Sequence, residues 1–209
     1  MPGLKPHTLL LLLGLLASPT AMAAEERVDS EHWTNDYDGH FKKYTKRYFG
    51  PHFDWHWFKA QGIAESGLRS NVTSHAGARG VMQILPTTYD EIKDKNPHFR
   101  DISKPRWNIA AGIYYDRQLY RRWNTLTEPE RLYTVFASYN AGYNRIRRIY
   151  QRLNKSDSKW QHIHPRLPKE TRGYVKRIRK LKDDTRRQDS EGRLKGIANY
   201  FNVASRSEE

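Results

Sequence analysis

The stretch AESGLRSN, residues 64–71, places one carboxylate, Glu65, among small residues where an aromatic-rich helix is expected to end. Asp54 is positioned to cap this helix at its start, and Phe58 is one of the apolar side chains along it. Gly67 suits the end of the helix because glycine readily adopts a left-handed conformation. This stretch therefore predicts a helix that carries an acid at its last turn and then enters a loop.

Glu65 has two readings at this point. A single glutamate late in a helix is most often solvated or paired with a nearby cation. On the inner face of a helix rich in apolar side chains, however, a carboxyl would be desolvated and its pKa would rise. No other Asp or Glu occurs between Ser66 and Tyr89, so acid–base chemistry in this loop would have to use Glu65.

The spacing of apolar residues predicts helices over most of the chain. The expected helices cover 36–49, about 54–65, a segment opening at Pro86, 108–123, a segment after a Thr127–Glu130 capping box, about 144–153 and about 169–182. Residues 69–79 are polar and small, which is typical of a loop. With no internal repeat and no strand-rich region, the sequence predicts a compact all-α domain.

The N-terminus indicates export. Lys5 precedes the apolar run 9–17, and the small residues of 21–23 form a signal-peptidase site, so residues 1–23 are expected to be a cleaved signal peptide. The chain contains no cysteine, which excludes disulfides, thiol catalysis, thiolate metal sites and a lipid anchor on an N-terminal cysteine. We expect a periplasmic or secreted protein.

Positive charge is concentrated near the C-terminus. The formal net charge is +14, and residues 145–187 contain 16 Lys and Arg against 4 Asp and Glu. Such a run is most often a solvated face, but in an exported protein it favours contact with an anionic wall polymer or membrane surface. No specific nucleic-acid partner is expected, and the sequence identifies no protein partner.

Three motifs occur in fixed order: AESGLRSNVTSHAGARGVMQ (64–83), ASYNAGYNRI (137–146) and PKETRGYVKRI (168–178). Together they resemble the lysozyme-like catalytic domain of the lytic transglycosylases of bacterial cell walls, the soluble-transglycosylase family. The catalytic module of the membrane-bound F-type enzymes is the most similar. The resemblance covers about residues 45–182, and three ordered motifs around one glutamate are far more specific than one.

The resemblance implies an enzyme that cleaves the β-1,4 bond between N-acetylmuramic acid and N-acetylglucosamine in peptidoglycan without water, leaving a 1,6-anhydro end. Glu65 would be the sole catalytic acid and base. No cofactor is implied. The residues implied to contact substrate or to hold Glu65 are Ser66, Met82, Gln83, Tyr139, Asn140 and Tyr174. Tyr139 and Tyr174 are equally compatible with packing in the core.

Four segments are expected from these observations. They are the signal peptide 1–23, an N-terminal extension 24–44, the catalytic domain 45–183 and a polar C-terminal tail 184–209. The nine histidines show no familiar ligand spacing, so no metal site is expected.

Two other functions stay open. A hydrolytic lysozyme of similar fold would need a second carboxylate across the cleft. The candidates for that carboxylate are Asp90, Glu91, Asp94 and Asp101. A non-enzymatic cationic protein of the cell envelope would use the basic helices to bind a polyanion without degrading it.

Overall fold

The computed structural model describes the backbone of residues 33–153 and 159–206, and nearly all of it outside the loops is helical. The elements are α2 (Asp38–Phe49), α3 (His56–Ser66), α4 (Pro86–Lys95), α5 (Pro105–Arg122), α6 (Glu130–Ala141), α7 (Tyr143–Gln151), α8 (Trp160–Ile163), the short 3-10 helix η3 (His164–Arg166) and α9 (Lys169–Arg206). Within the described residues the only β-type pairings are isolated bridges in the 73–84 loop. The predicted all-α fold is confirmed.

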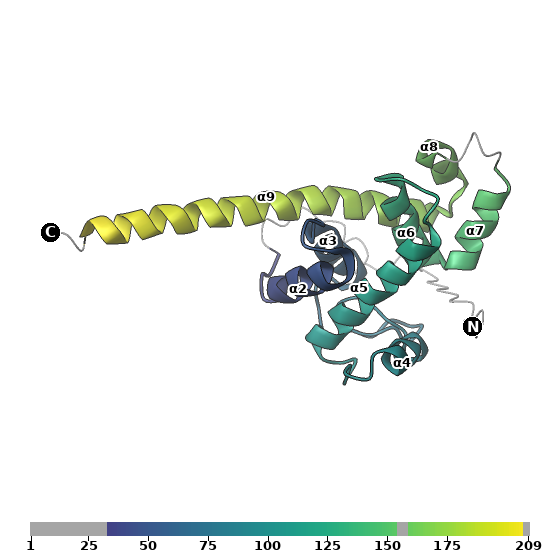
Figure 1. Ribbon diagram of the computed structural model, residues 1–209, viewed down its shortest axis with the longest axis horizontal. Helices are drawn as coiled ribbons and strands as arrows, with labels where there is room; N and C mark the ends of the chain where they lie inside the picture. The colour runs from purple at the N-terminus through teal and green to yellow at the C-terminus, as the bar shows by residue number, and fades with distance from the viewer. Residues whose placement is uncertain (1–32, 154–158, 207–209) are drawn as a thin grey trace.

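Helix α3 lies at the centre of the helical packing. It contacts α9 and α2, while α6 packs against α5, α7 and α9. Figure 1 shows α9 passing over α3 and α6 before its C-terminal part extends beyond the other helices. The largest fully buried side chains come from almost every helix, including Phe41, Phe58, Ile113, Phe136 and Ile146. One apolar core therefore joins these helices, while the C-terminal part of α9 lies outside it.

The sequence signals at the two ends of α3 operate as expected. Asp54 Oδ1 accepts a hydrogen bond from the backbone N–H of His56 at 3.1 Å, which satisfies a donor in the first turn. At the other end Gly67 has φ +63° and donates its N–H to the carbonyl of Ile63 at 2.8 Å. The helix thus stops directly after Glu65 and Ser66, and the chain turns back over it.

The predicted capping box before α6 does not form. The helix begins at Glu130 with Pro129 at the N-cap position, and no side chain caps it. Thr127 contributes its backbone carbonyl to the N–H of Arg131 instead of its hydroxyl. With Pro129 at the N-cap, Glu130 is the first residue of the helix instead of the third, so Thr127 and Glu130 are out of register for a capping box.

Helix α9 is longer than the sequence indicated. The predicted helix 169–182 continues without a break to Arg206, through most of the expected polar tail. Its exposed part contains charge pairs at helical spacing, with Arg187 on Asp184 and Arg193 on Asp189. Such pairs favour a solvated helix without giving the apolar periodicity by which a buried helix is found in a sequence.

Residues 1–23, the expected signal peptide, lie outside the described residues. Among the helices that the structure describes, none combines the length and apolar character needed to cross a bilayer.

Candidate active site

Glu65 occupies the last turn of α3 and is partly buried. The Tyr174 hydroxyl, which comes from the second turn of α9, donates a hydrogen bond to Glu65 Oε1 at 2.6 Å. The contact joins two motifs that lie far apart in the sequence. Tyr174, which the family resemblance placed beside the Glu65 carboxyl, does contact Glu65.

The surroundings of Glu65 favour its protonated form. Burial raises the pKa of Glu65 to about 8, against the opposing effects of the Tyr174 hydrogen bond and the positive charge of Arg177. The negative charge of Glu170 raises the pKa slightly further. The sequence-based expectation of a desolvated acid at this position agrees with this geometry.

The segment 79–83 is fastened to α5 by one asparagine. Asn108 Nδ2 donates to the carbonyl of Arg79 at 2.8 Å, and its Oδ1 accepts from the backbone N–H of Met82 at 2.7 Å. Gly80 has φ +73°, and a Cβ there would lie 2.7 Å from Asn108 Nδ2. Glycine is required at position 80 for both reasons. Sequence reasoning did not identify Asn108.

Tyr139 also holds this segment. The Tyr139 side chain is buried, its hydroxyl donates to the carbonyl of Met82 at 2.8 Å, and its ring packs edge-on against Tyr115. Burial and the nearby Glu65 carboxyl both raise the pKa of Tyr139. Tyr139 is therefore both a core residue and a neighbour of Glu65.

Two other predicted residues bind the protein's own backbone through their side chains, and a third is buried. Ser66 Oγ donates to the carbonyl of Val81 at 2.8 Å, and Gln83 Nε2 donates to the carbonyl of Gly80 at 2.9 Å. Met82 is fully buried. These contacts explain how the loop after Glu65 keeps its shape. The roles of Ser66, Met82 and Gln83 toward a substrate stay predictions.

Asn140 supports the tyrosine from α9. Its Oδ1 accepts a hydrogen bond from Thr171 Oγ1 at 2.8 Å, which ties the end of α6 to the first turn of α9. Thr171 lies three residues before Tyr174, so it is a neighbour of Tyr174 on the helix surface. Asn140 thereby helps to fix the helix that presents the phenol to Glu65.

A second carboxyl, which sequence reasoning missed, lies in the core near Glu65. Asp116 of α5 is completely buried and accepts a long hydrogen bond, 3.4 Å, from Gln61 of α3. Burial raises the pKa of Asp116 well above its usual range, and the Glu65 carboxyl adds to the effect.

The acids proposed from the sequence as a second carboxylate lie elsewhere. Asp90, Glu91 and Asp94 belong to α4, and Asp101 lies in the following loop, where it binds Ser103. The charged side chains that act on the Glu65 pKa come from α9. No group of three or more His, Asp or Glu among the described residues is arranged to hold a metal ion.

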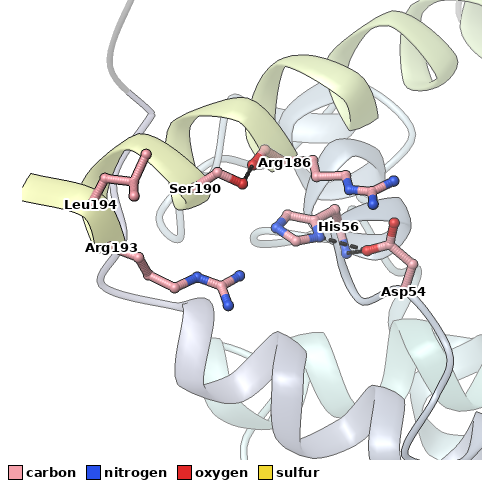
Figure 2. Close-up of a pocket in the computed structure, with 6 residues that line it drawn as sticks. All are labelled: Asp54, His56, Arg186, Ser190, Arg193 and Leu194. Atoms are coloured by element: carbon pink, nitrogen blue, oxygen red, sulfur yellow. Dashed lines mark hydrogen bonds and ion pairs between the residues drawn. The ribbon is translucent and has the colours of Figure 1, made fainter. Parts of the chain in front are cut away.

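A separate pocket of about 640 Å³ lies at the opposite end of α3. Figure 2 shows its lining residues, which come from the N-terminal end of α3 and the loop before it and from positions 186–194 of α9: Asp54, His56, Arg186, Ser190, Arg193 and Leu194. Helix geometry puts His56 about 14 Å from Glu65 along α3. The two ends of this helix thus carry different clusters of charged groups.

Comparison with known proteins identifies the family. Residues 43–163 match the family described as the transglycosylase SLT domain. The chain belongs to this family. It is 31% identical over 127 residues to membrane-bound lytic murein transglycosylase F of Aliivibrio fischeri, an alignment that covers 59% of this chain and 24% of that protein.

Membrane-bound lytic murein transglycosylase F of Desulfosudis oleivorans is also 31% identical, over 120 residues that cover 56% of this chain and 25% of that protein. The chain therefore spans about a quarter of the length of these curated relatives. The family match ends before Tyr174, although Tyr174 touches Glu65. Tyr174 therefore lies outside the residues that the family match covers.

Solved structures support the lysozyme-like helical fold. The 70 kDa soluble lytic transglycosylase of Escherichia coli superposes with a TM-score of 0.62 at 22% identity, covering 79% of this chain and 30% of that one. An inactive glutamate-to-glutamine mutant of the lytic transglycosylase Slt from Pseudomonas aeruginosa gives 0.65 at 21% identity, covering 75% and 25%. At these identities the likeness concerns the fold.

Proposed function

We propose that this chain is a peptidoglycan lytic transglycosylase in which Glu65 acts first as the acid and then as the base. The observation that carries the proposal is the Glu65 carboxyl itself, held by Tyr174 on a family-typical scaffold with its pKa raised to about 8. The names of the relatives support the choice of murein as substrate. Residues 45–183 would form the catalytic domain.

The first step uses the proton on Glu65. Because Tyr174 donates to Oε1, the acidic hydrogen of Glu65 is assigned to Oε2. That hydrogen passes to the bridging oxygen of the glycosidic bond as the bond to the anomeric carbon breaks. The N-acetyl oxygen of the same sugar stabilises the positive charge left on that carbon. Tyr174 and the charge of Arg177 stabilise the Glu65 carboxylate that is formed.

The second step restores Glu65. The carboxylate takes the proton from the C6 hydroxyl of the muramic acid, and the C6 oxygen forms a bond to the anomeric carbon. The products are a free hydroxyl on one fragment and a 1,6-anhydro ring on the other, with no water consumed. One carboxyl is sufficient, because the substrate supplies the other two reactive groups, whereas most glycosidases use a pair of carboxyl groups.

Product analysis tests the proposal against a hydrolytic lysozyme. Purified sacculi are digested with the wild-type protein in ¹⁸O-labelled water, and the released muropeptides are analysed by mass spectrometry. We expect fragments lighter than the hydrolysis products by one water and free of ¹⁸O at the new end. Hydrated, ¹⁸O-labelled ends would contradict the proposal and would require a second carboxylate. Sacculi that bind the protein but never dissolve would favour the cationic binding protein instead.

The basic surface gives the proposal a binding component. We propose that Lys and Arg of residues 145–187 retain the enzyme on the anionic wall after export. Binding to sacculi by the inactive Glu65→Gln variant should then weaken as salt rises, because salt screens exposed charges. Salt-independent binding would remove this component and leave the catalytic proposal intact.

A further inference from the structure

The carboxyl of Asp116 lies in the core, and in the described part of the chain an amide is its only hydrogen-bond donor. Asp116 is 0% exposed, and among the described residues its Oδ2 has no hydrogen-bond partner. Its Oδ1 lies 3.4 Å from Gln61 Nε2. An ionised carboxylate with one long hydrogen bond from a neutral amide would be strongly destabilising at a fully buried position.

The Gln61 side chain also has an acceptor atom that a proton on Asp116 could satisfy. Its side-chain oxygen, Oε1, is likewise buried and has no hydrogen-bond partner among the described residues. An ionised Asp116 and Gln61 would therefore leave two unpaired acceptor oxygens on adjacent groups. A proton on Asp116 Oδ2 converts one of them into a donor, and an acid and an amide can then exchange two hydrogen bonds. This pairing requires Asp116 Oδ2 to come within hydrogen-bond distance of Gln61 Oε1, beside the contact that already joins Oδ1 to Nε2.

The pair is connected to Glu65 in two ways. Gln61 precedes Glu65 by four residues on α3, so the two side chains are neighbours on one surface of the helix. The charges also interact, since Glu65 raises the pKa of Asp116 and Asp116 raises the pKa values of Tyr139 and Tyr174. Two carboxyls that share such a region resist being ionised together.

We propose that Asp116 is a neutral carboxylic acid in the working enzyme and that its pair with Gln61 is a positioning element for Glu65. The acid–amide pair holds α3 against α5 one turn below the catalytic carboxyl. Because Asp116 keeps its proton, it places no negative charge beside Glu65 when Glu65 ionises. Asp116 touches no substrate, so it is a positioning residue. The positioning role rests on the proposed function; the protonation of Asp116 does not.

Carbon NMR tests the proton directly. In protein labelled with ¹³C at the aspartate carboxyl carbons, the Asp116 signal is assigned by backbone correlation and by its loss in Asp116→Asn. We expect this signal to stay at the position of a protonated acid from pH 5 to pH 7.5. In Glu65→Gln its titration should shift to lower pH, because the negative charge of Glu65 is gone. A signal at the ionised position at pH 7 would overturn the proposal whatever the enzyme activity proves to be.

Kinetics test the positioning role. The Asp116→Asn side chain cannot ionise but can still pair with Gln61, so we expect less than a tenfold loss of kcat and an alkaline limb of the pH profile at the wild-type position. An alkaline limb displaced to lower pH would mean that Asp116 carries a charge in the wild type. That result would contradict the proposal.

A double variant separates positioning from stability. Asp116→Leu leaves the buried Gln61 amide without its hydrogen-bond partner and should lower both stability and kcat. The double variant, Gln61→Leu with Asp116→Leu, replaces the polar pair by an apolar contact. We expect the double variant to regain stability but to keep at least a tenfold deficit in kcat at unchanged KM. Recovery of both together would show that the pair only supports the fold. If neither Leu variant folds, the NMR titration and the Asp116→Asn profile still decide the outcome.

Discussion

The two ends of α3 place carboxyl groups in opposite protonation states. At the N-terminal end, burial alone would raise the pKa of Asp54, but hydrogen bonds from His56 and the charge of Lys182 outweigh it and lower the pKa to about 2. At the C-terminal end, burial prevails and raises the pKa of Glu65 to about 8. Burial acts in the same direction at both ends, so the neighbouring donors and cations decide the outcome.

The difference lies in what each end offers to a negative charge. His56 is itself almost fully buried, with Nδ1 2.5 Å from Asp54 Oδ1 and Nε2 3.4 Å from Asp189 Oδ2. Burial of Asp189 is likewise outweighed, by a hydrogen bond from Arg193 and the charge of Lys42, and its pKa is lowered. At the Glu65 end, the Tyr174 phenol and the positive charge of Arg177 favour ionisation but do not outweigh burial. We infer that the first end fastens α9 to α3, whereas the second holds an acid ready to release its proton.

The largest effect expected at either end is the loss of activity in Glu65→Gln. Removing the only proton donor should reduce the release of muropeptides from sacculi by at least about 10³-fold, the scale of general acid–base catalysis. A matched control is Glu191→Gln, which makes the same change on an exposed surface of α9 and should retain activity. Substantial activity in Glu65→Gln would mean that another group supplies the proton.

The same substitution should stabilise the protein at neutral pH. Glu65 binds its proton more tightly in the folded state than in the unfolded chain. As the pH rises from about 4.5 to about 8, ionisation of Glu65 in the unfolded chain therefore progressively lowers the stability of the folded state. Gln has no such titration. At pH 7 the gain should approach about 3 kcal/mol at most, less to the extent that the partly exposed carboxyl is solvated. Urea unfolding of the wild type and of Glu65→Gln at pH 4.5 and pH 7 measures this gain. An equal difference in unfolding free energy at the two pH values would contradict the raised pKa of Glu65.

A smaller and more specific effect is expected for Tyr174→Phe. The Tyr174 hydrogen bond lowers the pKa of Glu65, so its loss should move the alkaline limb of the pH–rate profile to higher pH. The Glu65 carboxylate formed in the first step would also be less stabilised, which should reduce kcat by about tenfold. The pH dependence of kcat measures both effects. A limb that moves to lower pH would show that the phenol does not donate to Glu65.

The other end of α3 should affect stability and not catalysis. Asp54 contributes stability that is present above pH 3.8 and is lost as the pH falls toward 2, so Asp54→Asn should destabilise the protein by up to about 2 kcal/mol at pH 7 and by little near pH 2. Asp36→Asn, at an exposed position, serves as the control. A loss for Asp54→Asn that does not depend on pH would indicate a packing defect instead of a lost charge interaction.

The sequence predicted the Glu65 end better than its electrostatic partners. The aromatic residues of 54–65 raised the possibility of a desolvated acid but left the solvated reading open, because the partners of Glu65 come from α9. Asp116 was missed although a signal existed. It lies three residues after Ile113 and seven after Ile109, on the surface of α5 that the apolar pattern assigned to the core. A carboxylate on that stripe indicates a buried acid even before any partner is known.

Other features could not be predicted from local patterns. The hydroxyl of Ser66 reaches the carbonyl of Val81, and Asn108 holds the segment 79–83, only because the loop folds back over α3 and α5. Such contacts depend on tertiary packing, which leaves no periodic signal. The exposed half of α9 was missed for the opposite reason, since a helix with no buried stripe resembles a polar tail in sequence.

The position of Tyr174 on α9 determines how far the protein can be shortened. A fragment ending with the family match at residue 163 would retain Glu65 but lose the phenol that bonds to it and the Thr171 hydroxyl that binds Asn140. Its glutamate would face solvent where α9 now covers α3. Recombinant fragments intended to measure catalysis should therefore extend through α9 at least past the buried Leu181 and Thr185, the residues by which this helix stays seated on the domain.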